Sequence, residues 1–147
     1  MSQRLALVLT GLALALTVPA CAPKLVGPTA GSGYVFSLEV SQAIIWVGQI
    51  ELSRLAQFPQ VSEVSVRVQD AQGRAVDGVP VIFELEPGWA SSITLAPAQT
   101  TTRGGIARAV ISEPQTSGIV YIRARVDNTT AQTRLTVQTY PGRSASQ

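Results

Sequence analysis

Residues 61–85 read VSEVSVRVQDAQGRAVDGVPVIFEL, and this stretch decides the fold class. In its first part, polar residues alternate with the valines Val64, Val66 and Val68. Such alternation is typical of a β-strand with one buried face. A polar turn follows at residues 70–74, and a second alternating stretch runs to Leu85. The sequence therefore predicts two strands, and it requires further partners because an isolated pair is only marginally stable in water.

The rest of the chain contains the partners that this pair needs. Short apolar or alternating segments lie at residues 34–40, 44–47, 93–95, 106–111, 120–126 and 134–137. Turn-forming residues separate them at intervals of roughly 8–12 residues, a spacing typical of an all-β sandwich of about seven strands. Residues 50–58 suit either a bulged strand or one helical turn. No segment carries a helical apolar stripe, so helices longer than one turn are not expected.

Composition excludes several kinds of chemistry. The 147 residues include no histidine and a single cysteine, so neither a zinc site of the usual His/Cys kind nor a His-dependent catalytic triad can form. The formal net charge is only +2, and the basic residues are scattered along the chain. Nucleic-acid-binding proteins instead cluster such residues on one face. We therefore predict no catalytic residues, no metal, no cofactor and no nucleic-acid partner.

Residues 1–20 have the pattern of a bacterial export signal. A short head with one positive charge precedes an apolar run, and small residues close the segment before Cys21. The run is shorter than the ~20 residues that span a bilayer comfortably. The ending VPAC, residues 18–21, resembles the lipobox of bacterial lipoproteins, which implies cleavage before Cys21 and acylation of its thiol. An ordinary secretory peptide or a retained anchor are the alternatives.

These features predict the organisation of the chain. Residues 1–20 form the signal peptide, and residues 21–33 form the lipidated cysteine and a flexible tether rich in Pro, Gly and Ser. Residues 34–139 form the sandwich, and residues 140–147 form a disordered tail. Ala22 follows the cysteine, and the resemblance to the lipoprotein sorting pattern then favours the outer membrane or the cell surface.

The strand motifs resemble the bacterial immunoglobulin-like domain of the invasin and intimin type. The resemblance covers roughly residues 34–138, and its motifs are Val64–Val68, Asp70–Gly73, Ala75–Phe83, Thr101–Ala107 and Gly118–Ala124. Ala75 and Arg103 depart from the family pattern, which usually has Pro and Asp there. The resemblance implies an immunoglobulin-like β-sandwich without a shared active site. Family members act as spacers, adhesin stalks or binding modules.

Two loops are the first candidates for ligand binding. Trp89 follows Pro87 and Gly88, and an exposed Trp there would be a binding anchor, whereas a buried one would cap the core. The second candidate is the turn formed by Arg103, Gly104 and Gly105. Trp46 lies inside an apolar run, so core or inter-strand packing is favoured for it.

Two charged pairs also require an interpretation. Glu84 and Glu86 share one face of a strand, as do Arg123 and Arg125. The carboxylates could act in acid/base chemistry or bind calcium, and the arginines could meet lipid headgroups or an acidic polysaccharide. A solvated strand face with cross-strand charge pairs explains both pairs more simply.

We therefore predict a non-catalytic cell-envelope lipoprotein whose domain binds or supports a protein or polysaccharide partner. Two alternatives stay open. One is a carbohydrate-binding accessory module or small enzyme that uses Trp89 and the Glu84/Glu86 face. The other is a subunit of a surface layer or fibre, in which exposed edge strands pair between copies.

Overall fold

The structure is a computed structural model that describes residue 27 and residues 29–141. Cys21, the predicted signal peptide and most of the predicted tail lie outside the described residues. The elements in chain order are β1 (Val35–Val40), β2 (Ile44–Val47), η1 (Leu52–Arg54), β3 (Ser62–Gln69), β4 (Pro80–Leu85), β5 (Thr94–Ala96), β6 (Gln99–Thr101), β7 (Ile106–Ser112), β8 (Gly118–Val126) and β9 (Thr129–Thr139). The 3-10 turn η1 resolves the ambiguity of residues 50–58 in favour of a helical turn.

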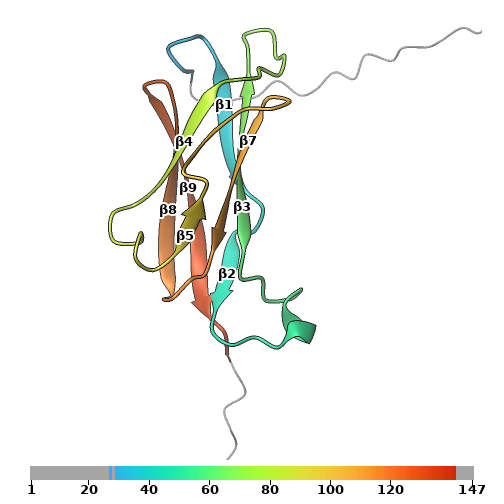
Figure 1. The fold of residues 1–147 in the computed structure, drawn as a ribbon, viewed down its shortest axis with the longest axis vertical. Coiled ribbons are helices and arrows are strands. Elements are labelled where there is room, and N and C mark those ends of the chain that lie inside the picture. Colours follow the sequence, from blue (N-terminus) through green and yellow to red (C-terminus); the bar gives the residue numbers. More distant parts are fainter. Residues whose placement is uncertain (1–26, 28, 142–147) are drawn as a thin grey trace, which may run out of the picture.

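The strands form two sheets packed face to face (Figure 1). One sheet has the order β1-β3-β7-β5, and the other has the order β2-β9-β8-β4-β6. All neighbouring strands are antiparallel except β2 and β9, which are parallel. The predicted all-β sandwich is therefore confirmed. The strand β5 corresponds to the expected segment 93–95, and the short strand β6, which was not expected, brings the number of strands above about seven.

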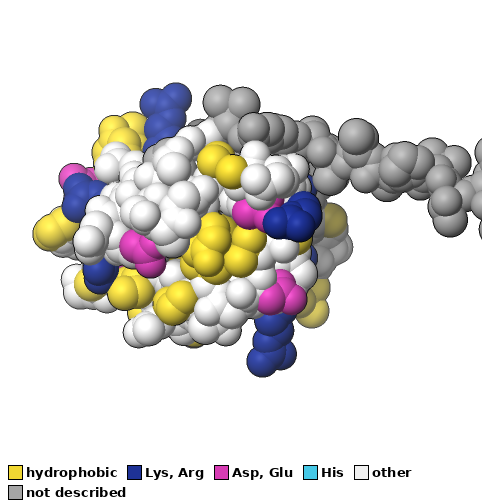
Figure 2. All heavy atoms as spheres, turned by 90° about the horizontal axis from the view of Figure 1, so that it is seen from above, with side chains coloured by type: hydrophobic (Ala, Val, Ile, Leu, Met, Phe, Trp, Pro, Cys, Tyr) yellow, Lys and Arg dark blue, Asp and Glu magenta, His cyan; other side chains and the backbone are white. Residues whose placement is uncertain are grey.

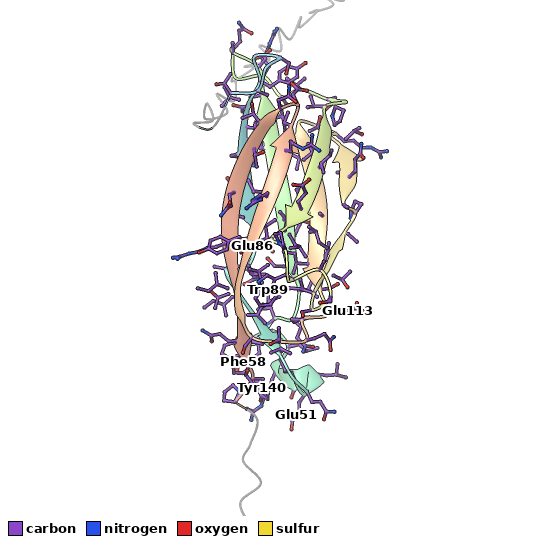
Figure 3. The ribbon with its side chains drawn as sticks, turned by 90° about the vertical axis from the view of Figure 1, so that its left-hand side faces the viewer. Glu51, Phe58, Glu86, Trp89, Glu113 and Tyr140 are labelled. Atoms are coloured by element: carbon purple, nitrogen blue, oxygen red, sulfur yellow. The ribbon has the colours of Figure 1, made fainter. Side chains whose placement is uncertain are left out.

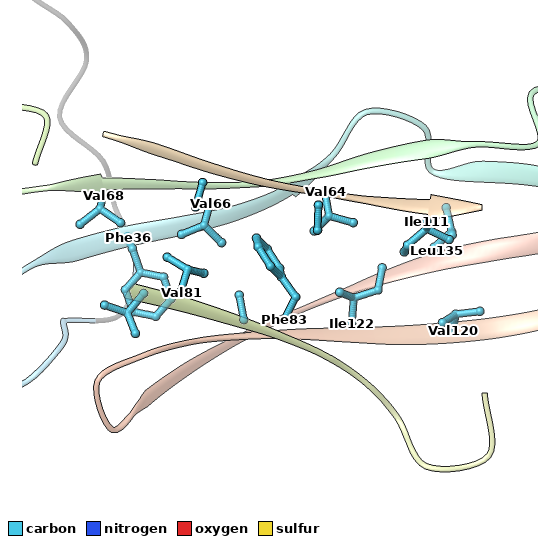
Figure 4. Packing of buried hydrophobic residues seen from close by; sticks show 14 of the residues in the cluster. Phe36, Val64, Val66, Val68, Val81, Phe83, Ile111, Val120, Ile122 and Leu135 are labelled. Atoms are coloured by element: carbon cyan, nitrogen blue, oxygen red, sulfur yellow. The ribbon is translucent and has the colours of Figure 1, made fainter. Parts of the chain in front are cut away.

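The core lies between the sheets, where the alternating residues of both predicted strands meet. Val64, Val66 and Val68 are fully buried on β3, and Phe83 on β4 is 2% exposed. Val66 and Phe83 come from opposite sheets and project into the same layer (Figure 4). The predicted inside and outside faces of residues 61–85 are therefore confirmed. Apolar burial of this kind is the main favourable contribution to folding.

Three of the four sheet edges are short or covered. In the five-stranded sheet, the backbone N–H of Trp46 on β2 donates to the carbonyl of Pro59 at 2.8 Å, so a loop occupies that edge. The strands β5 and β6 form two further edges and have three residues each, and the six-residue strand β1 forms the fourth edge. Natural sheets use both devices against edge-to-edge association. Among the described strands, the edge pairing that the fibre alternative requires would therefore fall to β1.

The folded domain begins earlier than predicted. Ala30 is buried, and its N–H donates to the carbonyl of Tyr34 at 2.7 Å. The Ser32 hydroxyl donates to Asp127 Oδ2 at 2.6 Å, and the Thr129 hydroxyl donates to the carbonyl of Thr29 at 3.2 Å. The prediction of a flexible tether as far as residue 33 is therefore wrong for residues 29–33. Their small side chains allow a tight turn that packs beside the β8–β9 hairpin.

The folded domain also ends later than predicted. The backbone N–H of Tyr140 donates to the carbonyl of Val47 at 2.9 Å, which continues the pairing of β9 with β2. The prediction that a disordered tail begins at residue 140 is wrong for Tyr140 itself. Because Tyr140 extends the last strand, its ring is held at the end of the sandwich.

Candidate binding surface

The loops gather at the two ends of the sandwich. The end that carries residues 29–34, 70–79, 102–105 and 127–128 is called the upper end, as it stands in Figure 1. The end that carries η1 and Tyr140 is called the lower end. Figure 2 views the upper end and shows basic and acidic side chains scattered over a mostly polar surface. No field of a single sign extends across it, so this face does not favour a strongly charged partner.

The predicted turn of Arg103, Gly104 and Gly105 lies at the upper end, where Gly105 has a structural role. The Gly105 N–H donates to Asp77 Oδ1 at 2.8 Å, and its carbonyl accepts the Val68 N–H at 2.8 Å. A Cβ at position 105 would lie 2.7 Å from the Cβ of Ala75, and φ is +72°. Only glycine tolerates both conditions. Arg103 and Gly104 are exposed, so the turn offers one charged side chain on a rigid base.

The neighbouring loop between β3 and β4 is held by Asp70. Its carboxylate accepts hydrogen bonds from the backbone N–H groups of Gln72 and Arg74 and from the Arg74 side chain. The bond from the Arg74 backbone N–H is the main cause that lowers the pKa of the Asp70 carboxyl. Asp70 therefore stabilises a turn, as the sequence predicted for this position.

Trp89 lies in the lower half of the molecule, far from the Arg103 turn (Figure 3). It is half-buried and packs against the core, and a Cβ at Gly118 would lie 2.9 Å from its indole ring. Glycine at position 118 thus leaves room for the indole. Trp89 caps the core, which was one of its two predicted roles. The structure does not bring the two candidate loops together, and their roles in ligand binding remain predictions.

The charged pairs lie on the outer face of the five-stranded sheet. Glu84 is exposed and stands opposite Arg123 in the pairing of β4 with β8. Within the described residues, neither Glu84, Glu86, Arg123 nor Arg125 takes part in an ion pair. This arrangement agrees with the predicted solvated face, but the predicted cross-strand charge pairs are not formed among the described residues. The described residues also contain no cluster of three side chains able to hold a metal ion.

An aromatic cluster at the lower end was not predicted from the sequence. The rings of Trp46 and Phe58 meet edge to face with centroids 5.0 Å apart, and those of Phe58 and Tyr140 do so at 4.9 Å. The Arg54 guanidinium donates to the Tyr140 hydroxyl at 3.3 Å. Phe58 and Tyr140 lie beside η1 in Figure 3. Trp46 is half-buried and alternates with the buried Ile45, so it lies on the outer face of its sheet against Phe58 and not in the core.

Exposed apolar side chains surround this cluster. Leu52 on η1 is 87% exposed, Ile44 is 41% exposed and Ile119 is 48% exposed. Ile44 and Ile119 both stand opposite Thr136, on either side of β9, so they belong to one patch. We call Ile44, Trp46, Leu52, Phe58, Ile119 and Tyr140 the lower-end surface. Apolar and aromatic centres with Arg at the rim are typical of protein–protein interfaces.

A groove lies next to this surface. It has a volume of about 500 Å³ and runs between the end of β2, the start of β3 and the end of β7. Glu113 stands at its rim with φ +55°, a backbone conformation that residues other than glycine seldom adopt.

In residues 27 and 29–141, no helix is long and apolar enough to cross a membrane.

Comparison with solved structures places this arrangement among known folds. The D00-D0 domain of intimin matches with a TM-score of 0.57 and 16% identity, over 76% of this chain and 50% of that one. The adhesin InvE of Yersinia pseudotuberculosis matches with a TM-score of 0.55 and 18% identity, over 76% of this chain and 30% of that one. A family 2 glycosyl hydrolase of Bacteroides cellulosilyticus matches with a TM-score of 0.51 and 15% identity, over 69% of this chain and 14% of that one.

These similarities define the fold class. No protein-family model and no curated protein matches the sequence. The chain spans half or less of the length of the three structures described above. Its domain has an all-β, immunoglobulin-like sandwich fold, as the sequence motifs predicted, and it is similar in structure to domains of intimin and InvE. Adhesins and a hydrolase share this fold, so the fold alone does not determine a function.

Proposed function

We propose that this chain is a non-catalytic, lipid-anchored module of the bacterial cell envelope that binds a protein partner through the lower-end surface. The observation that carries the proposal is the placement of the two ends. The chain enters the domain at the upper end, where Ser32 and Asp127 fix it, and the aromatic cluster lies at the opposite end.

Attachment through Cys21 would orient the domain. Thr29 follows Cys21 by eight residues, so an extended chain of this length reaches about 26 Å at ~3.3 Å per residue. The last residues of the predicted tether, 29–33, pack on the domain, which shortens its reach. A lipidated Cys21 would therefore keep the upper end near the membrane and direct the lower end away from it.

The lower-end surface supports binding of a protein. Aromatic side chains supply a large contact area at a small cost in conformational entropy, and Trp, Tyr and Arg are enriched among the residues that dominate binding energy. Here Trp46, Tyr140 and Arg54 lie within one cluster beside the exposed Leu52. Exposed apolar patches of this kind mark interaction sites in soluble domains.

The arrangement supports binding more than catalysis. The sequence contains no histidine, and its single thiol is assigned to lipid in this proposal. Glu84 is exposed on an outer sheet face, whereas a catalytic acid at neutral pH needs an environment that raises its pKa. Trp89 is half-buried and packs on the core, so it offers a sugar ring less surface than an exposed Trp would.

Replacing Ile44 with aspartate is expected to abolish binding while the fold is retained. Ile44 is 41% exposed, so a charge there would place a desolvated carboxylate in the interface without entering the core. The measurement is affinity purification of the lipidated protein from its own membranes, with quantification of the protein that copurifies in stoichiometric amount. Its recovery is expected to fall at least about tenfold, which corresponds to ~1.4 kcal/mol.

The matched control is Val110→Asp. Val110 is 39% exposed and lies on β7 in the other sheet, so it tests the same chemical change on a face without the aromatic cluster. Recovery should stay at the wild-type level. If Val110→Asp loses the copurifying protein and Ile44→Asp retains it, the lower-end surface is not the binding site.

A further inference from the structure

The groove beside the lower-end surface is lined by both apolar and polar side chains. Its volume of about 500 Å³ falls within the range of roughly 300–1,000 Å³ that is usual for ligand pockets. Val47 and Val61 supply apolar surface, and Gln49, Gln60 and Gln115 supply amide groups. A ligand for this groove therefore needs an apolar portion and a polar head.

The groove has one charge, and that charge is unpaired. Glu113 is the only charged residue among the described residues that line it. Its Oε2 accepts a hydrogen bond from the Thr94 hydroxyl at 2.9 Å on the β5 side, where Thr94 and Glu113 line a neighbouring depression, and within the described part of the chain Glu113 forms no ion pair. A carboxylate accepts several hydrogen bonds, so Glu113 retains capacity for a cationic donor.

The backbone holds this carboxylate in place. The Gln115 side chain donates to the Glu113 carbonyl at 3.1 Å, and the Gln115 N–H donates to the Ser92 carbonyl at 2.8 Å. The φ of Glu113 is +55°, a backbone conformation that is strained for a residue with a Cβ and not for glycine. Asp127 is the other described non-glycine residue with positive φ, and its carboxylate fixes Ser32. Among the described residues, the hydrogen bond of the Glu113 side chain is the exposed one from Thr94.

We propose that this groove binds a lysine or arginine side chain of the protein partner. The methylene stem would lie on Val47 and Val61, as long basic side chains do on apolar surface, and the cationic head would meet Glu113. The inference rests on the proposed function only in taking a protein as the partner. It predicts a basic residue in the partner segment that crosses from the lower-end surface into the groove.

The test is a titration of the full chain, lipidated and in detergent micelles, followed by amide chemical shifts in NMR. The probes are acetyl-Gly-Lys-Gly-amide, its arginine and glutamine counterparts, and the amino disaccharide of glucosamine. The lysine and arginine peptides are expected to shift the amides of Gly48, Val61 and Gln115 saturably, and salt should weaken the effect. The glutamine peptide should not shift them. Tighter binding of the amino disaccharide than of both basic peptides would overturn the proposal.

Two variants distinguish the effect of the Glu113 charge from the effect of its backbone conformation. Glu113→Gln removes the charge and keeps the shape, and it is expected to weaken peptide binding about tenfold or more. Glu113→Gly removes the side chain and suits the positive φ, so it should lose binding while the unfolding midpoint stays the same or rises. Glu86→Gln, on the outer sheet face, is the control and should bind normally. Unchanged binding in Glu113→Gln, or no saturable shift at the groove, would contradict the proposal.

These outcomes are independent of the test of the proposed function. Peptide binding to the groove is measured without the natural partner, so it does not depend on Ile44. Loss of the partner in Ile44→Asp with no peptide binding would retain the proposed function and reject the groove. Peptide binding with normal partner recovery in Ile44→Asp would retain the groove and reject the lower-end surface as the partner's binding site.

Discussion

Replacing Phe83 with alanine is expected to lower the free energy of unfolding by about 3–5 kcal/mol. Phe83 is among the largest side chains of the core, is 2% exposed and lies between the two sheets (Figure 4). Its removal deletes apolar burial and leaves a cavity that the surrounding strands can fill only in part. A loss of this size is a large share of the ~5–15 kcal/mol that stabilises a typical domain. Equilibrium unfolding in urea measures it.

The control is Arg67→Ala on β3. Arg67 is exposed and alternates with the buried Val66 and Val68, so its side chain lies on the outer face. A surface change of this kind usually stays within about ±0.5 kcal/mol. Equal losses from the two variants would mean that the register of the strands, and with it the assignment of the core, is wrong.

Replacing Cys21 with serine is expected to move the protein out of the membrane fraction or to leave it uncleaved. In the proposed function, Cys21 carries the acyl chains, each buried methylene of which contributes ~0.8 kcal/mol to membrane binding. Without the thiol, no acyl chain can be attached. Fractionation of cells, with immunoblotting for the mature and precursor forms, measures the change.

Ala22→Ser is the control for this substitution. It alters the neighbouring residue by one hydroxyl group and leaves the thiol of Cys21 in place, so the protein should stay in membranes. Processed Cys21→Ser protein that remains in the membrane fraction would show that attachment does not depend on the cysteine. The domain would then be attached to the membrane by a feature other than an acylated Cys21.

The fold could be predicted because its information is local. The alternation of Val64, Val66 and Val68 and the motif ending at Phe83 specify buried faces directly, and both faces lie where they were expected. Turn residues such as Asp70 also act within a few positions of themselves. Such features are readable from spacing alone.

The binding surface could not be predicted in the same way because it depends on distant contacts. Phe58 meets Tyr140 because β9 pairs with β2, and neither residue lies in a sequence pattern that predicts the contact. The turn at residues 29–33 likewise packs because Asp127 is brought beside Ser32. Trp89 could have been assigned to the core if the room left by Gly118 had been known. The positive φ of Glu113 has no signal in the sequence at all.

Site-specific photo-crosslinking in intact cells tests most directly whether the lower end contacts the partner. A benzophenone side chain would replace Leu52, which is 87% exposed at the lower end, or Asn128, which is exposed in the turn at the upper end. Both positions tolerate a large side chain because neither is buried. The expected result is a discrete crosslinked protein from position 52 and none from position 128. A discrete product from position 128 alone would contradict the proposed orientation and the assignment of the binding surface.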